Sequence, residues 1–526
     1  MTTNTRKQLH EQLWAGAQQA RANSSLKLNE LSEPMLGLIF LKFADIRFRK
    51  AKQEIEESRD GKSGGRQRPI TQDDYLARGV MYVPEEALYS SILSLKEGES
   101  IGKALNNAMK LIEQHNRDLA GILPQNYTAI SKKAAENNQI LISLLKNFNN
   151  IPDSIDGDAL GEIYEFFLGE FALSEGQKGG EFFTAQPIVK LLVEVIEPYH
   201  GRIFDPACGS GGMFVQSANF IKKHLEGRKE VMSEVSIFGQ EKTSASVNIA
   251  KMNLAIHGLS GNIIESNSYY DDPHKCIGKF DFVLANPPFN VSGVDKNKQV
   301  VIDPARIKND KRYYIGLPTT QKGTITNANY LWIQMFAAAL NDKGRAGFVM
   351  ANSASDAGHA EKEIRKKIVD SGIVDVIVAV GSNMFLNVTL SSTLWFLDKG
   401  KRGTDREKKV LFVNAHDIFT VVDRAHNTWT DEQVEEIASI VRSYRGEEGY
   451  SKYKNIQGRC QVATIEEIAA NDYSLNPGRY VEIVDEPISD GDFDIEFREL
   501  STKFTSLVQQ SHMLEKEILD GLKKIF

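Results

Sequence analysis

Apolar residues recur at two spacings along the chain, and the change from one to the other divides it into regions. In about the first 150 residues they lie three or four positions apart, as in Met35, Ile39 and Phe43, which places them on one face of a helix. Two further stretches, Ile101 to Arg117 and Ala134 to Phe148, repeat this helical spacing. The pattern therefore predicts a helical N-terminal domain over residues 1–157.

From there on, short apolar runs alternate with amphipathic stretches, which is typical of an α/β fold. The predicted strands are Arg202 to Asp205, Val235 to Gln240, Ile263 to Glu265, Phe280 to Ala285, Ala346 to Met350, Val374 to Val380 and Thr393 to Leu397. The predicted helices include Ile188 to Ile196, Met213 to His224, Ser244 to His257 and Tyr330 to Leu340. We therefore expect a Rossmann-like, doubly wound domain over residues 158–402, with its ligand crevice beyond the carboxyl ends of the strands.

The C-terminal region, residues 403–526, has a mixed pattern with one regular feature near its end. Apolar residues recur there at spacings of three, four and seven, at Leu500, Phe504, Leu507, Leu514, Ile518, Leu522 and Ile525. This stripe fits a core helix or a coiled-coil arm that binds a partner helix about equally well.

Composition narrows the class of protein. The chain of 526 residues is too long for one core, and its 41% hydrophobic and 25% charged residues are ordinary for a globular protein. No apolar run reaches the roughly 18 residues of a membrane helix, and the N-terminus has no apolar signal core. We therefore expect no membrane partner. The three cysteines lack disulfide or metal-ligand spacing, so we also expect no metal site, and their small number suits a cytoplasmic location.

Charge bears on possible partners. The net charge is −7, from 63 basic and 70 acidic residues, whereas a protein that binds DNA or RNA unaided is usually basic. If nucleic acid is the substrate, a partner should supply much of the binding.

A glycine-rich turn follows the first predicted strand. Asp205 to Met213, DPACGSGGM, joins that strand to a helix, and its glycines would let the backbone pass close under a ligand. The turn lacks the lysine of a phosphate-binding P-loop. Glu241 ends the second strand, where a carboxylate would bind a ribose diol. A structural turn and a surface glutamate are the alternatives.

Two more segments carry candidate chemistry. Gly179 to Pro187, GGEFFTAQP, could wrap a ligand, although packing under the sheet edge explains its phenylalanines equally well. Asn286 to Phe289, NPPF, ends a strand in a turn that two prolines make rigid. The Asn286 side-chain oxygen and a free carbonyl would offer two acceptors beside the Phe289 ring, a site for a planar ring with an NH2 group. The alternative is a strand-ending turn with a core phenylalanine.

In this order, GEFFTAQP, DPACGSGGM, GQE, AKMNLAIHG and NPPF resemble the amino-methylating DNA methyltransferases. More closely, the chain resembles the modification subunit of type I restriction–modification systems, and the resemblance runs through nearly its whole length. It implies S-adenosylmethionine as cofactor and N6 of adenine as methyl acceptor. The family commonly has Thr-Pro where this chain has Thr184-Ala185.

The resemblance also implies roles for single residues. Asn286 Oδ1 and the Pro287 carbonyl would accept both N–H bonds of the adenine amine, within the turn that Pro288 stiffens, and the flipped base would stack on Phe289. The implied cofactor-binding residues are Glu181, Phe182, Phe183, Thr184, Ala185, Gln186, Asp205, Gly209, Ser210, Gly211, Gly212 and Glu241.

Partners are implied as well. About forty residues separate Phe289 from the helix at Tyr330, too few for a separate domain that reads DNA sequence. This absence fits the resemblance, which implies double-stranded DNA as substrate and a specificity subunit that reads its sequence. It also implies two modification subunits to one specificity subunit, and a helicase–nuclease restriction subunit. The C-terminal stripe would bind the specificity subunit.

Two classes of alternative stay open at this stage. An NPPF turn also serves enzymes that methylate guanine N2 in RNA or a glutamine amide in protein, because these acceptors are also planar NH2 groups. A non-catalytic assembly subunit could retain the same fold.

Overall fold

The computed structural model describes residues 3–22, 24, 26–60, 68–96, 98–133, 139–155, 157–174, 184–224, 235–385, 391–423, 426–482 and 490–525. The chain divides into two compact units, Met1–Val481 and Glu482–Phe526. In the part of the chain that is described, no helix combines the length and the apolar character needed to cross a bilayer.

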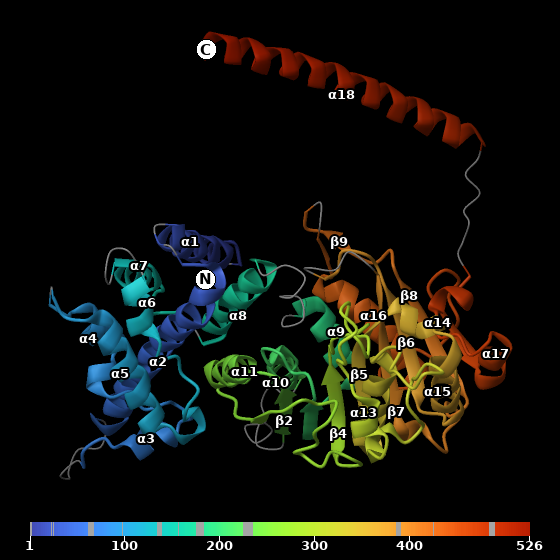
Figure 1. Cartoon of the computed structure of the whole chain (residues 1–526), viewed down its shortest axis with the longest axis horizontal. Coiled ribbons are helices and arrows are strands. Elements are labelled where there is room, and N and C mark those ends of the chain that lie inside the picture. Colours follow the sequence, from blue (N-terminus) through green and yellow to red (C-terminus); the bar gives the residue numbers. More distant parts are fainter. Residues whose placement is uncertain are drawn as a thin grey trace. The chain divides into compact units, whose positions relative to one another are not determined.

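The first part of the larger unit is helical, as the spacing predicts (Figure 1). Its helices are α1 (Thr3–Ala22), α2 (Leu28–Asp60), α3 (Gln72–Leu76), α4 (Tyr89–Leu93), α5 (Ile101–His115), α6 (Tyr127–Lys133), α7 (Gln139–Phe148) and α8 (Gly157–Ser174). The apolar run from Met35 to Phe43 lies in α2 and is buried in the core of this region. The predicted helix over Ala134 to Phe148 begins at Gln139 in the structure, and residues 134–138 lie outside the described residues.

The second part is built on a nine-stranded sheet with the order β11-β8-β6-β7-β5-β4-β1-β2-β3. The strands are β1 (Gly201–Asp205), β2 (Val235–Glu241), β3 (Asn262–Glu265), β4 (Phe280–Ala285), β5 (Leu340–Ala351), β6 (Val374–Val380), β7 (Ser392–Asp398), β8 (Lys409–Ala415) and β11 (Cys460–Thr464). A separate two-stranded hairpin comprises β9 (Thr420–Val421) and β10 (Asn427–Thr428). Within the large sheet, β7 is antiparallel to both of its neighbours and β11 is antiparallel to β8.

The strand order creates a crevice between β1 and β4. From β1 the chain proceeds through β2 and β3 on one side, and β4 then pairs in parallel on the other side of β1. At such a switch point the connections leave in opposite directions and open a ligand crevice beyond the carboxyl ends. Asp205 ends β1 and Asn286 follows β4, so both lie at this crevice.

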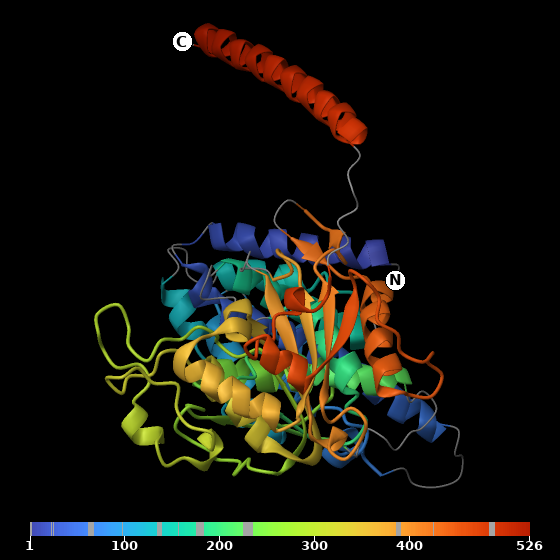
Figure 2. The same cartoon turned by 90° about the vertical axis from the view of Figure 1, so that its right-hand side faces the viewer.

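Helices cover both faces of the sheet (Figures 1 and 2). On one face α9 (Gln186–Ile196), α10 (Gly212–His224) and α16 (Asp431–Arg445) share a core with the sheet, and on the other α13 (Asn329–Ala339) and α15 (His359–Asp370) do. Along β5, Val349 belongs to the first core and its neighbours Phe348 and Met350 to the second, as the period of two in a strand requires. The predicted doubly wound α/β fold is confirmed.

The C-terminal region continues this sheet. Strand β8 pairs in parallel with β6, β11 pairs with β8, and α16 packs in the same core as α9. The predicted start of the region at residue 403 therefore lies between two strands of one sheet. The division at residues 157 and 402 stays a prediction.

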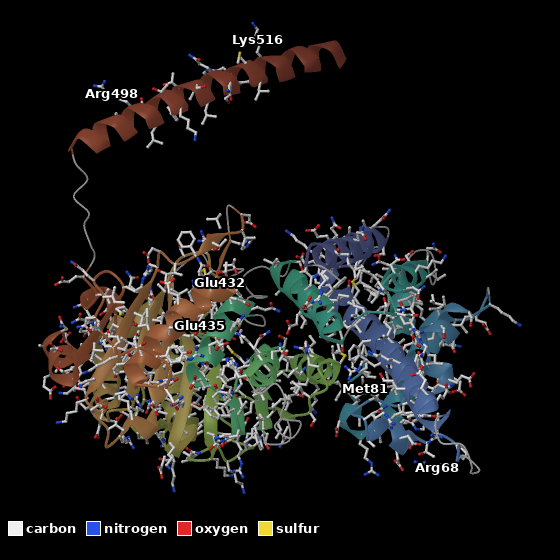
Figure 3. The ribbon with its side chains drawn as sticks, turned by 180° about the vertical axis from the view of Figure 1, so that it is seen from behind. Arg68, Met81, Glu432, Glu435, Arg498 and Lys516 are labelled. Carbon is white, nitrogen blue, oxygen red and sulfur yellow. The ribbon has the colours of Figure 1, made fainter. Side chains whose placement is uncertain are left out.

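Helix α18 (Asp490–Ile525) forms the smaller unit. Leu500, Phe504, Leu507 and Leu514 of the predicted stripe are exposed by 59, 69, 55 and 57%. They therefore do not form part of a core within the smaller unit. Figure 3 draws the described side chains of α18 and labels Arg498 and Lys516; those of Ile518, Leu522 and Ile525 lie outside the described residues.

Candidate active site

The turn after β1 is a glycine loop that ends at α10. Gly209 and Gly211 have φ angles of 52° and 79°, which side chains rarely tolerate, so the glycines give the loop its path. A Cβ at Gly212 would meet no atom within 4 Å. Asp205 is buried and accepts a hydrogen bond of 2.9 Å from the Ala207 N–H, which closes the start of the loop. Burial raises the pKa of the Asp205 carboxyl well above its usual range.

Two neighbouring side chains fix the loop. Glu241, at the end of β2, accepts from the Gly209 N–H at 3.0 Å. Asn253, on α11 (Ser244–Ile256), donates to the Ser210 carbonyl at 2.8 Å. The Asn253 Oδ1 atom is buried, and no described residue donates to it. Glu241 is thus hydrogen-bonded to the loop. Its contact with a ribose stays a prediction.

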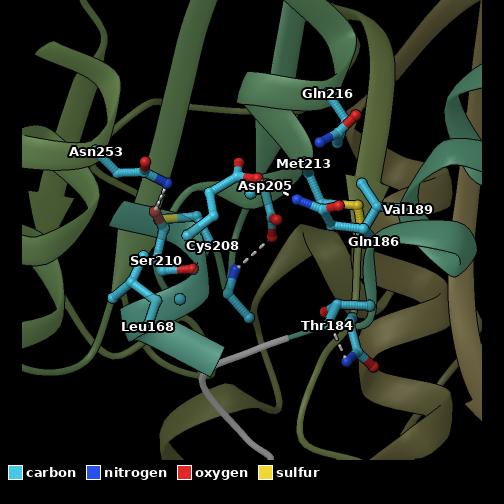
Figure 4. Close-up of a pocket in the computed structure, with 15 residues that line it drawn as sticks. Leu168, Thr184, Gln186, Val189, Asp205, Cys208, Ser210, Met213, Gln216 and Asn253 are labelled. Carbon is cyan, nitrogen blue, oxygen red and sulfur yellow. Dashed lines mark hydrogen bonds between the residues drawn. The ribbon is translucent and has the colours of Figure 1, made fainter. Parts of the chain in front are cut away.

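A cavity of about 530 Å³, including its open mouth, lies beside this loop (Figure 4). Its lining comes from α8, from the start of α9, from the glycine loop with α10, from α11 and from the end of β4: Glu165, Leu168, Thr184, Gln186, Val189, Asp205, Ala207, Cys208, Gly209, Ser210, Gly212, Met213, Gln216, Asn253 and Asn286. Four sequence motifs that are far apart in the chain therefore meet in one cavity.

The predicted cofactor residues divide into three groups. Those that line the cavity are Thr184, Gln186, Asp205, Gly209, Ser210 and Gly212. Ala185 and Gly211 are next to lining residues in the sequence, and Glu241 contacts one, but these three do not line the cavity. Glu181, Phe182 and Phe183 lie outside the described residues.

The Asn286 amide is oriented by Thr184. Its Nδ2 donates to the Thr184 Oγ1 at 2.9 Å, so its Oδ1 is left as an acceptor. That oxygen is buried, and no described residue donates to it. Because a buried acceptor without a donor costs about 1–3 kcal/mol, a ligand N–H placed there would be favoured. The structure thus offers an acceptor at the position that the turn predicts.

The rest of the turn is held from α13. Pro287 is buried, and the Pro288 carbonyl accepts a hydrogen bond from the Trp332 Nε1 at 3.2 Å. Phe289 is half-buried and packs against the cores on both faces of the sheet. A base could stack only on the part of the Phe289 ring that remains exposed, and this contact stays a prediction.

Glu165 is a cavity residue that the sequence did not reveal. It lies on α8, accepts a hydrogen bond from the Gln186 Nε2 and has an oxygen 3.8 Å from the His257 Nε2. Burial raises the pKa of this carboxyl to about 7. The only signal was one acid between Tyr164 and Phe166 in an apolar helix. Asn253 was also missed, although it stands in the quoted AKMNLAIHG motif.

Cys208 also lines the cavity, but its thiol is unsuited to covalent chemistry. The side chain is 5% exposed, and burial raises the pKa of the thiol well above its usual range. Because the thiolate is the nucleophilic form, Cys208 acts as a small buried residue in the loop.

Comparisons with known proteins match nearly the whole chain. The family profile described as N-6 DNA Methylase covers residues 155–487, and the profile described as HsdM N-terminal domain covers residues 9–148. The type I restriction enzyme MjaIX methylase subunit of Methanocaldococcus jannaschii is 36% identical over 98% of this chain and 91% of its own length. The HindI methylase subunit of Haemophilus influenzae is 33% identical over 81% of this chain and 91% of its own length.

A solved structure has the same fold. The methyltransferase subunit of a type I restriction-modification system from Streptococcus thermophilus superposes with a TM-score of 0.72, covering 91% of this chain and 100% of that chain. The sequence identity is 22%, so this likeness concerns the fold.

Proposed function

The chain belongs to the N-6 DNA methylase family, among the methylase subunits of type I restriction enzymes, and from that premise we propose how its cavity works. It is an adenine-specific DNA methyltransferase of this family. The cavity would bind S-adenosylmethionine and receive an adenine extruded from duplex DNA. The observation that carries this assignment is the buried Asn286 Oδ1, an acceptor without a described donor at the end of β4.

The residues present fit the cofactor. A side chain at Gly212 would occupy space that the loop leaves empty. The Asn253 Oδ1 and the Asp205 carboxyl offer acceptors to an amino group, and Thr184 and Gln186 also line the cavity. When bound, the cofactor supplies a methyl group on a sulfonium, which is open to in-line displacement by an amine.

The turn activates the adenine amine through two acceptors. That amine is a weak nucleophile because its lone pair is delocalised into the ring. Asn286 Oδ1 would accept one N–H bond, and the Pro287 carbonyl, which the family resemblance implies as the second acceptor, would accept the other. Both bonds favour a tetrahedral nitrogen and stabilise the positive charge that develops on it before a proton leaves to water.

Thr184 would act as a positioning residue. Its hydroxyl accepts from the Asn286 Nδ2, which keeps the amide from presenting its NH2 group to the base. The part of the Phe289 ring that remains exposed would stack on the flipped base.

We further propose that the chain works within an assembly. The exposed apolar stripe of α18 would pair with a helix of a specificity subunit that reads the DNA sequence, two modification subunits binding one specificity subunit. The restriction subunit would join the same complex. The curated relatives are named as methylase subunits of restriction enzymes, which supports this arrangement. The family assignment does not favour the RNA guanine, protein glutamine or non-catalytic alternatives.

The substitution Asn286→Ala tests the mechanism. In complex with the specificity subunit, it should lower methyl transfer to duplex DNA by about 100-fold or more, because one interaction made in the transition state is lost. Calorimetry should give an unchanged affinity for S-adenosylhomocysteine. The exposed Asn150→Ala is the matched control and should retain full activity. Full methylation by the Asn286 variant would refute the assigned role.

A further inference from the structure

The segment between the catalytic turn and α13, residues 291–328, is locally basic. It contains seven lysines and arginines and three aspartates, in a chain whose net charge is −7. Six of the cations are exposed: Lys296, Lys298, Arg306, Lys308, Lys311 and Lys322. Of the acids only Asp295 is exposed, since Asp303 and Asp310 are partly buried. We call the six exposed cations the basic surface.

The basic surface stands on an anchored segment. Arg312 is 1% exposed and donates to the carbonyls of Ser268 and Asp271 at 2.8 and 3.0 Å. The Tyr313 hydroxyl donates to the Tyr269 carbonyl at 2.9 Å. Apolar side chains of the segment are also buried in the core that α13 and α15 share with the sheet: Ile302, Ile307 and Ile325. Figure 2 shows the segment as yellow-green loops beside the sheet.

Both ends of the segment are joined to the catalytic turn. Asn290 directly follows Phe289 and has a φ angle of 59°. Its N–H donates to the Asn329 Oδ1 at 2.8 Å, and its own Oδ1 accepts from Asn327, Asn329 and Ser353 at 3.1 to 3.2 Å. Short polar contacts therefore hold both ends of the segment that carries the basic surface next to the catalytic turn.

The cations of this surface are not neutralised within the described residues. None of the five lysines forms an ion pair there, and Arg306 lies over the Tyr270 ring with its guanidinium carbon 3.7 Å from the ring centroid. A solvated loop would not need buried anchors or a link to the turn. The charge of the surface is complementary to a polyanion that approaches the catalytic turn.

We propose that the basic surface binds the phosphate backbone of the DNA duplex beside the adenine that Asn286 receives. The inference rests on the proposed function and adds to it a place where this acidic chain itself contacts its substrate. Lysine contacts with phosphates position a duplex without reading its sequence, which suits a subunit whose sequence recognition lies on another chain. The same arrangement explains why the cations gather on the segment that follows the catalytic turn.

The test replaces the four lysines Lys296, Lys298, Lys308 and Lys311 by glutamine in the complex with the specificity subunit. Four lost phosphate contacts should raise the Kd for duplex DNA about 10-fold to 100-fold and reduce the magnitude of the slope of log K against log salt by about 3.6. The loss should be the same for DNA with and without the target sequence. The kcat at saturating DNA and the affinity for S-adenosylhomocysteine should not change.

A matched variant controls for total charge. Lys52, Lys103, Lys408 and Lys452 are exposed outside residues 291–328, and their replacement by glutamine removes the same charge. If both variants lose DNA affinity equally, or if the first binds DNA normally but loses the specificity subunit, the proposal is wrong. If the fourfold variant folds poorly, the double variant Lys308→Gln, Lys311→Gln replaces it and should show a smaller loss of DNA affinity. DNA binding is measured without catalysis, so failure of Asn286→Ala to stop methylation would refute the proposed function and leave this result standing.

Discussion

Glu165 is a carboxyl group kept from water beside the cofactor cavity. Burial raises its pKa from 4.5 to about 7, although the hydrogen bond from Gln186 acts in the opposite direction. Between these two values the folded chain holds a proton that the unfolded chain has lost. The free energy of unfolding therefore falls as the pH rises through this window, and the loss is complete only above about pH 7.

The substitution Glu165→Gln should remove this dependence while keeping a side-chain oxygen for Gln186. In the native chain, this one group should lower the free energy of unfolding by about 2 kcal/mol between pH 5 and pH 8. The variant should lack this decrease. Urea unfolding at both pH values measures the difference. The exposed Glu466→Gln is the matched control. Equal pH dependence in native and variant chains would contradict the assignment.

The predicted residues that line the cavity include those whose position is set by local sequence. Asn286 and the glycine loop stand at strand ends, where the order of residue types already defines a turn and its unused acceptors. Glu165 and Asn253 act through contacts across the fold, with Gln186 and with the Ser210 carbonyl. The sequence around Glu165 and Asn253 does not indicate these partners, so the two residues are identified only in the folded structure.

At the scale of elements, α11 connects the helical region to the sheet. Met252 and Ile256 are buried in the core of the helical region, whereas Ala250 and Leu254 are buried in the core of the sheet. Asn253 stands between the two faces and holds the glycine loop. The helical region therefore packs against an element that also shapes the cofactor cavity.

The pair Met252→Ala and Leu254→Ala tests this connection. Both side chains are at most 1% exposed, so each substitution should destabilise the chain by about 2–5 kcal/mol. Hydrogen exchange should separate them: Met252→Ala should raise exchange in α2 and α8, and Leu254→Ala in β2 and β3. The same pattern of exchange in both variants would show that α11 does not divide its contacts between the cores.

The sheet illustrates what a strand pattern can predict. The bounds of β4 and β6 were predicted to the residue, because each is an apolar run with a single aspartate at its second position that ends at a turn residue, Asn286 or Gly381. Strands β8 and β11 were not recognised. Five residues of β11, CQVAT, carry little pattern, and the strand is defined by pairing with β8 about fifty residues earlier. Edge strands of this kind depend on a partner that the local sequence does not specify.

At the scale of the whole molecule, charge and exposed apolar surface lie on different parts of the chain. The net charge of −7 opposes DNA binding in general, while the basic surface would permit it at one place. The exposed stripe of α18 instead suits a helix from another protein. We infer that assembly with a specificity subunit, and not the chain alone, provides most of the affinity for DNA.

Deletion of Glu482–Phe526 tests this division. The compact unit Met1–Val481 contains the sheet and the cavity, so the shortened chain should fold and bind S-adenosylhomocysteine normally. It should not elute with the specificity subunit in gel filtration, and methylation of target DNA should be lost. Intact complex formation by the shortened chain would contradict the role of α18.

A finer variant separates the stripe from the helix as a whole. Leu500→Ser, Leu507→Ser and Leu514→Ser should abolish the complex, because exposed leucines at these spacings lie on one face of the helix. Arg498 and Lys516 are eighteen residues apart, a whole number of helical turns, and lie on the opposite face (Figure 3). Their replacement by glutamine should leave the complex intact. If the two variants weaken the complex equally, the partner contacts α18 through charge and not through the apolar stripe.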